Sequence, residues 1–184
     1  MRIGCCSDTH DNLKLAQQAI ETFTSANVDM IVHCGDIVSP FTASLFDTGI
    51  PLHAVRGNND GEWALASTIE GFENGSGTYH GESAHLSLEN HANESSDSTV
   101  DIAVYHGTSE RLVDALLGCG QYDYVLRGHT HEQTVELSDG SVHVNPGGLP
   151  ISGADDTYHV AIVDTNHAVS TDAVTVHAIS ANDN

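Results

Sequence analysis

The sequence has very few cationic side chains. Only five of its 184 residues are Lys or Arg, against 26 Asp or Glu, so the formal net charge is −21, and Lys14 is the single lysine. A field of this sign repels polyanions, which argues against charge-driven binding of nucleic-acid polymers. The acidic residues are scattered and 39% of the chain is hydrophobic, so we interpret them as a solvated surface of the halophile type. We expect high ionic strength to stabilise such a surface by screening its self-repulsion.

Long apolar runs are also lacking. No stretch has the length of a membrane span, and Met1-Arg2 leads directly into a strand-like segment instead of a signal peptide. We therefore expect a cytoplasmic protein with no membrane partner. Cysteine is scarce, and no CxxC pair is present. We expect four buried free thiols, of which the adjacent two face opposite sides of a strand: Cys5, Cys6, Cys34 and Cys119.

The length suits one domain, which we assign to residues 1–184. The β-α-β-α-β order of the first third predicts parallel strands joined by crossover helices, and the rest is mostly β. We expect an α/β fold with two stacked mixed β-sheets flanked by helices. The predicted helices are 13–26, 39–46, 61–69 and 109–117, and the predicted strands are 1–7, 30–34, 52–56, 79–88, 100–105, 124–127, 134–137, 142–144, 159–163 and 173–179.

Five of the predicted strands end in Asp, His or Asn, in most cases beside glycine. The carboxyl ends of strands form the functional crevice of an open sheet, and glycine permits tight turns and close backbone approach. Polar side chains at five such ends therefore predict a single site. The segments are Ser7-Asp8-Thr9-His10, Cys34-Gly35-Asp36, Arg56-Gly57-Asn58-Asn59-Asp60, His106-Gly107 and Gly128-His129-Thr130-His131.

This mixture of Asp and His suits a borderline divalent metal such as Mn, Fe, Co, Ni or Zn. Alternate side chains of an extended segment point the same way, so Asp8 with His10, and His129 with His131, can chelate. Seven candidate ligands are too many for one tetrahedral ion and suit two ions that share a carboxylate. Two metals about 3.5–4 Å apart clamp the attacking and leaving oxygens of a phosphoryl displacement. Each motif alone is weak, and their order and position carry the prediction.

With these motifs the chain resembles the calcineurin-like metallophosphoesterase superfamily. It resembles most closely the small single-domain prokaryotic phosphodiesterases of that superfamily. The resemblance extends from residue 3 to about residue 164. Beyond the five strand-end segments, its features are His33-Cys34-Gly35-Asp36, Val55-Arg56-Gly57-Asn58 and Asn145-Pro146-Gly147.

The resemblance implies a metallophosphoesterase-type α/β sandwich and a role for each ligand. It assigns Asp8, His10 and His131 to one metal, and Asn58, His106 and His129 to the other. Asp36 then bridges both ions and positions a hydroxide that attacks phosphorus. The implied function is a phosphodiesterase, a hydrolase that acts on a small phosphate ester with two divalent ions. We expect Mn, with Ni, Fe, Co or Zn as alternatives.

One departure from the family concerns the leaving group. Many members carry His after the metal-binding Asn, where this chain has Asn59, which can contact phosphate but cannot act as an acid near neutral pH. Two neighbouring residues keep two interpretations each. His33 is either a partner of a ligand or a core histidine, and Asp60 either orients a ligand or caps the following helix.

Two other functions compete with the phosphodiesterase. The first is a non-catalytic metal-binding scaffold, because a retromer subunit has this fold with an eroded metal site, whereas all seven ligand positions are intact here. The second is a nuclease acting on polymers, against which the net charge and the missing basic groove both argue. The sequence leaves an oligomer open.

Overall fold

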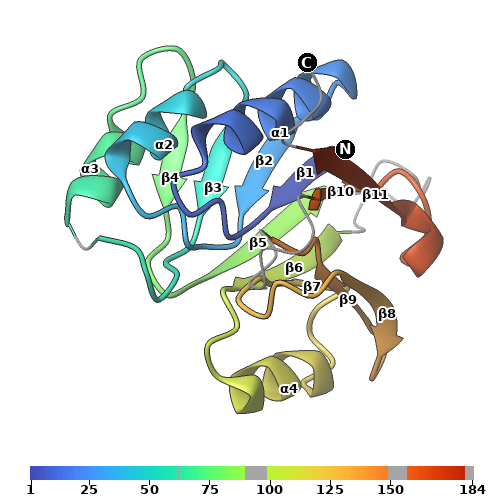
Figure 1. The fold of residues 1–184 in the computed structure, drawn as a ribbon. Coiled ribbons are helices and arrows are strands. Elements are labelled where there is room, and N and C mark those ends of the chain that lie inside the picture. Colours follow the sequence, from blue (N-terminus) through green and yellow to red (C-terminus); the bar gives the residue numbers. More distant parts are fainter. Residues whose placement is uncertain (62, 90–98, 149–156, 181–184) are drawn as a thin grey trace.

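The computed structural model describes residues 1–61, 63–89, 99–148 and 157–180, without the side chains of residues 63 and 157 (Figure 1). The helices are α1 (Leu13–Ser25), α2 (Pro40–Leu45), α3 (Trp63–Glu70) and α4 (Glu110–Gly118), with a short 3₁₀ helix at Thr171–Ala173. The strands are β1 (Arg2–Cys6), β2 (Met30–His33), β3 (Leu52–Ala54), β4 (Gly77–Tyr79), β5 (Ser83–Glu89), β6 (Thr99–Tyr105), β7 (Tyr124–Leu126), β8 (Thr134–Ser138), β9 (Ser141–Asn145), β10 (Thr157–Asp164) and β11 (Val174–Ser180).

The strands form two mixed sheets. The first has the order β11-β10-β1-β2-β3-β4, in which β1 to β4 are parallel and β10 and β11 are antiparallel to their neighbours. The second has the order β5-β6-β7-β9-β8, in which β6, β7 and β9 are parallel and the two edge strands are antiparallel. The α/β fold class with two stacked mixed sheets is therefore confirmed.

The helices and the two sheets form layers, because the apolar faces of the strands pack against helices on one side and against the other sheet on the other side. Helices α1, α2 and α3 cover the outer face of the first sheet, and α4 lies against the outer face of the second (Figure 1). Cys6 packs among the helices of the first layer, whereas Cys5 packs between the two sheets, as the alternation of strand side chains predicts. The layer between the sheets is mostly aliphatic, and the double sheet supports the loops at the strand ends.

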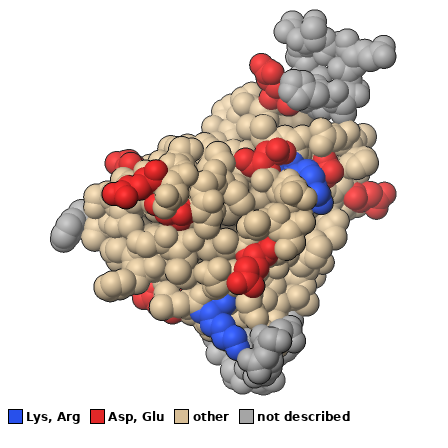
Figure 2. All heavy atoms as spheres, turned by 90° about the horizontal axis from the view of Figure 1, so that it is seen from above, with Lys and Arg blue, Asp and Glu red and all other residues tan. Residues whose placement is uncertain are grey.

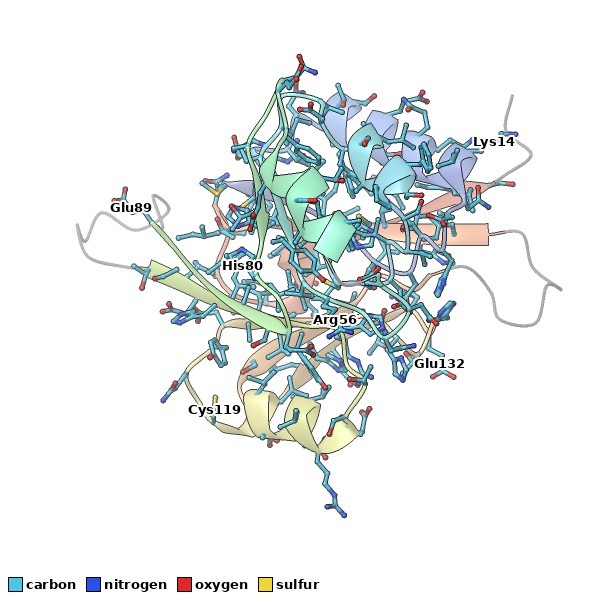
Figure 3. The ribbon with its side chains drawn as sticks, turned by 90° about the vertical axis from the view of Figure 1, so that its left-hand side faces the viewer. Lys14, Arg56, His80, Glu89, Cys119 and Glu132 are labelled. Atoms are coloured by element: carbon cyan, nitrogen blue, oxygen red, sulfur yellow. The ribbon has the colours of Figure 1, made fainter. Side chains whose placement is uncertain are left out.

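Two expectations were wrong. The predicted strand 79–88 is two strands, because the chain turns at Gly81, whose φ is +71°, and passes from β4 in one sheet to β5 in the other. Cys5, Cys6 and Cys34 are buried free thiols, but Cys119 is exposed. Cys119 caps the carboxyl end of α4, outside the packed layers (Figure 3), where its thiol donates to the carbonyl of Leu116.

One face of the molecule has the dispersed acidity that the sequence predicts. Figure 2 shows the carboxylates of one face as separate groups, with only a few cationic side chains among them. On this face they do not merge into one patch. Among the described residues, no helix combines the length and the apolar character needed to cross a bilayer.

Candidate metal centre

The predicted ligands meet where the strands of both sheets end. Asp8 and His10 follow β1, Asp36 follows β2, Asn58 follows β3, His106 follows β6, and His129 and His131 follow β7. In Figure 3 the labelled Arg56 and Glu132, which flank the loops after β3 and β7, lie near the level where the two sheets meet. The cluster thus draws on five loops that are far apart in the sequence.

The first group consists of Asp8, His10 and His131. The Nε2 atoms of His10 and His131 lie 3.3 Å apart, and their rings stack with centroids 5.1 Å apart. Oδ1 of Asp8 lies 3.4 Å from Nε2 of His131 and 3.7 Å from Nε2 of His10. The three donor atoms lie within 4.8 Å of one another, a spacing that a single cation can occupy.

The second group lies beside the first. Nε2 of His106 is 3.4 Å from Oδ2 of Asp36 and 3.1 Å from Oδ1 of Asn58, and the His129 ring packs edge-on against the His106 ring. Oδ2 of Asp36 also lies 3.6 Å from Nε2 of His10, which belongs to the first group. The Asp36 carboxylate therefore lies between the two sets of donors.

An orphaned oxygen indicates that this cluster fits a cation. Asp8 is fully buried, yet within the described part of the chain its Oδ1 has no hydrogen-bond partner of normal geometry. Leaving a buried carboxylate oxygen without a donor is costly. Because the donors around it are carboxylate and imidazole, the set suits a divalent transition metal.

The charges of the cluster are coupled. Burial raises the pKa of the Asp8 carboxyl, but the adjacent imidazoles of His10 and His131 lower it by more, so the resulting pKa lies well below its ordinary value. Burial likewise opposes ionisation of Asp36, yet hydrogen bonds from His106 and Asn59 bring its pKa below the usual value. Both carboxylates are therefore ionised at neutral pH, as metal binding requires.

Backbone strain is concentrated in the same loops. Nine of the described residues other than glycine have positive φ, and five of these nine are predicted ligands: Asp8, His10, Asp36, His129 and His131. Val38, two residues after Asp36, has a φ of +82°, which is rare for a β-branched side chain. Such conformations cost about 1–3 kcal/mol each and cluster at functional sites. The strain directs the ligands into one centre.

Asn59 is exposed, but both its backbone and its side chain contact the Asp36 carboxylate. Its backbone amide donates to Oδ1 of Asp36 at 2.7 Å, and its side-chain amide donates to Oδ2 at 2.8 Å. The structure thus adds a role that the sequence did not predict, which is to hold the central carboxylate. A phosphate contact by Asn59 stays a prediction.

Arg127 was not predicted to take part in the site. It is 2% exposed, donates to the carbonyls of Gly107 and Gly128, and forms a two-oxygen ion pair with Glu110. It therefore joins the loops that carry His106 and His129. The only signal in the sequence was a cation directly before Gly128 in a chain with few cations.

His33 is a core histidine. It is fully buried, its Nδ1 accepts from the Gly35 amide, its Nε2 faces Thr9 Oγ1 at 3.2 Å, and its ring meets Phe46 edge-on. With Nδ1 used as an acceptor, the imidazole is neutral. Its neighbours Thr9 and Gly35 lie in the two loops that carry Asp8 and Asp36, so it also packs beneath the site.

We expect His33 to make the fold sensitive to acid. Burial lowers its pKa from 6.5 to about 3, so between these values the unfolded chain binds a proton that the folded chain does not. Stability is then full above pH 6.5 and falls as the pH drops, by up to about 1.4 kcal/mol per pH unit. Urea denaturation of the metal-free protein at pH 7.5, 6.5, 5.5 and 4.5 measures this slope (roughly, the pH values run from the plateau above 6.5 into the upper part of the window between the two pKa values).

His33→Gln keeps an acceptor and a donor but cannot titrate. Its stability should fall less steeply than that of the wild type below pH 6.5 and differ from it by a constant above that value. Parallel curves at every pH would contradict the assignment of a buried neutral imidazole.

Sequence comparison relates the chain to known proteins. Residues 1–168 match the model of the calcineurin-like phosphoesterase superfamily domain. A phosphodiesterase of Methanocaldococcus jannaschii is 33% identical over 169 residues, covering 85% of this chain and 93% of the relative. A probable metallophosphoesterase of Methanothermobacter thermautotrophicus is 28% identical over 155 residues, covering 80% of this chain and 76% of the relative.

Solved structures show the same architecture. An archaeal phosphodiesterase superposes with a TM-score of 0.74 at 30% identity, covering 98% of this chain and 99% of its own. Vps29 of Entamoeba histolytica, solved with Zn²⁺, superposes with a TM-score of 0.64 at 14% identity, covering 98% and 99% of the two chains. The second likeness concerns the fold alone.

Proposed function

Since the chain belongs to the calcineurin-like phosphoesterase superfamily, and is therefore a hydrolase of phosphoester bonds, we propose that it cleaves small phosphodiesters at a centre of two divalent metal ions. The observation that carries the proposal is the arrangement of two donor groups around the central Asp36 carboxylate, next to the orphaned Oδ1 of Asp8. The phosphodiesterase activity of the archaeal relatives supports the choice of diester.

In this proposal each ion is held by three residues of its own, and one further residue contacts both ions. Asp8, His10 and His131 hold the first ion, Asn58, His106 and His129 hold the second, and Asp36 contacts both. When bound, such ions lower the pKa of a coordinated water and neutralise charge on the phosphoryl oxygens. Mn is the metal we expect, and Ni, Fe, Co or Zn also suit these donors.

The protein's own residues supply orientation more than proton transfer. Asn59 holds both oxygens of Asp36, and Arg127 fixes the loops of His106 and His129. A negative net charge disfavours polynucleotides, so the proposed substrate is a small phosphate ester. A screen of phosphomonoesters, phosphodiesters and cyclic nucleotides with added Mn²⁺ tests the proposal. Metal binding without turnover of any of them would favour the scaffold function instead.

We expect a steep dependence of rate on the leaving group. The Asn59 amide cannot protonate an alkoxide, and its N–H groups are engaged by Asp36. General-acid help is typically worth about 10²–10⁴-fold, so aryl diesters with acidic phenols should be cleaved faster than alkyl diesters by about that factor. The measurement is kcat for a series of substituted phenyl diesters at saturating Mn²⁺. A flat series, with the chemical step rate-limiting, would mean that another residue supplies the proton.

A further inference from the structure

We propose that Asp60 is the positioning residue that fixes the Asp36 loop against the Asn58 loop, an inference that rests on the proposed metal centre. Asp60 is only 5% exposed. Its Oδ2 accepts from the amides of Gly57 at 2.7 Å and Asp36 at 3.0 Å, and its Oδ1 accepts from the amide of Val38 at 2.7 Å. One carboxylate therefore joins the loop after β2 to the loop after β3.

The direction of these bonds distinguishes the two interpretations of Asp60. A helix cap accepts hydrogen bonds from the first turn of the helix that follows it. Both oxygens of Asp60 instead accept from residues that precede it, and two of the three donors belong to another loop. The contacts are those of a brace between two loops.

The brace acts where the backbone is strained. Asp36 and Val38 have φ values of +58° and +82°, and their amides are the ones that Asp60 accepts from. Left-handed backbone persists in residues other than glycine only when the surroundings hold it in place. Because this conformation directs the Asp36 side chain, Asp60 acts on the central carboxylate without touching it through its own side chain.

Close contact of the two loops leaves little room for adjustment. A Cβ at Gly35 would lie 2.7 Å from the backbone nitrogen of Gly57, and a Cβ at Gly57 would overlap Asp36. The loops therefore meet backbone to backbone, and the Asp60 carboxylate sets their relative position. Loss of one of its oxygens should displace Asn58 and Asp36 relative to His106, while Asp8, His10 and His131 lie in loops after β1 and β7.

The test is titration of the metal-free full-length protein with Mn²⁺, followed by calorimetry, for wild type, Asp60→Asn and Asp60→Ser. Asn keeps the shape of Asp60, but its NH₂ group must face one of the three amides. Loss of an outer partner of a ligand typically weakens metal binding about 10–100-fold. We expect the ion held by Asn58, His106 and His129 to bind more weakly by that factor in both variants. The other ion, which shares only Asp36 with this group, should bind more weakly by a smaller factor.

Asp47 provides a matched control. Its carboxylate also accepts three backbone amides, from Glu73, Asn74 and Gly75, but it joins the end of α2 to the segment before β4 and holds no predicted ligand. Asp47→Asn loses the same charge and the same kind of contact. It should leave the affinities for both ions within about threefold of wild type.

The outcomes separate this inference from the proposed function. Wild type that binds two ions, together with an Asp60→Asn variant that binds both equally well, would overturn the positioning role alone. Equal weakening by Asp47→Asn would also overturn it, because the effect would then be general. Wild type that binds one ion or none would overturn the binuclear centre and with it the role of Asp60. Circular dichroism verifies the fold of each variant, and Asp60→Ser provides the result if Asp60→Asn does not fold.

Discussion

Replacement of Asp36 by alanine is expected to lower phosphodiester turnover by about a thousandfold. Oδ2 of Asp36 lies 3.4 Å from Nε2 of His106 and 3.6 Å from Nε2 of His10, so its loss removes a donor from both groups at once. The Asn59 amide groups would also lose their acceptors. Both ions should then be bound more weakly and in altered positions.

The measurement is kcat with an aryl diester at saturating Mn²⁺. His131→Ala removes a donor from one group only and should lose less activity than Asp36→Ala. Asp114 is exposed on α4, and Asp114→Ala controls for the loss of one negative charge. Near-wild-type turnover of a folded Asp36→Ala protein would mean that the central carboxylate has been misassigned.

Removal of metal is expected to abolish turnover, and reloading is expected to restore it at two ions per chain. Without cations, the carboxylates of Asp8 and Asp36 repel a phosphate ester, and both are held ionised at neutral pH. Metal binding to the folded state should also raise its stability, by about 2.7 kcal/mol when the free metal is a hundred times Kd. Elemental analysis, activity and thermal melting of the same chelator-treated and reloaded samples measure the three effects together.

His131→Ala makes this experiment more specific. It should retain the ion held by Asn58, His106 and His129, and approach one ion per chain under conditions that load wild type with two. Full activity after exhaustive chelation would contradict metal dependence. A wild-type plateau at one ion, with Mn²⁺ in excess, would contradict the binuclear centre while leaving a mononuclear one.

The sequence predicted that these residues converge, and it could do so because strand ends are easily recognised. Apolar runs identified β1, β2, β3, β6 and β7, and the ligand types follow each run directly. Their convergence depended on these strands being neighbours within each sheet and on the two sheets stacking with these ends together. The division of residues 79–88 between two sheets was not predicted, because a turn at Gly81 within a continuous β pattern leaves little trace in the sequence. The point at which the chain passes from one sheet to the other is determined by tertiary packing.

The contacts around the predicted ligands could not be predicted from the sequence for a similar reason. Asp60 had two plausible roles in the sequence, and Asn59 was predicted only to contact phosphate. The contacts that the structure shows depend on the approach of the Asp36 loop, whose amide donates to Asp60 at 3.0 Å and whose carboxylate accepts from the Asn59 amide at 2.7 Å. The Arg127 brace needs carbonyls from two loops that only the folded second sheet brings together. Such bonds join positions 17 to 24 residues apart, and no local pattern encodes them.

The left-handed backbone of the ligand loops restricts how this centre can evolve. Asp, Asn and His tolerate positive φ better than most other residues, and these are also the residue types that the site uses as donors. Glutamate at position 36 would retain a carboxylate but would fit the φ of +58° less well. An exchange that conserves the chemistry of the donor would therefore still strain the backbone. Each of the five predicted ligand positions with positive φ therefore accepts a new residue only if that residue offers a donor atom and also tolerates a left-handed backbone. We expect natural and laboratory variants to interchange Asp, Asn and His within these loops and to vary freely only outside them.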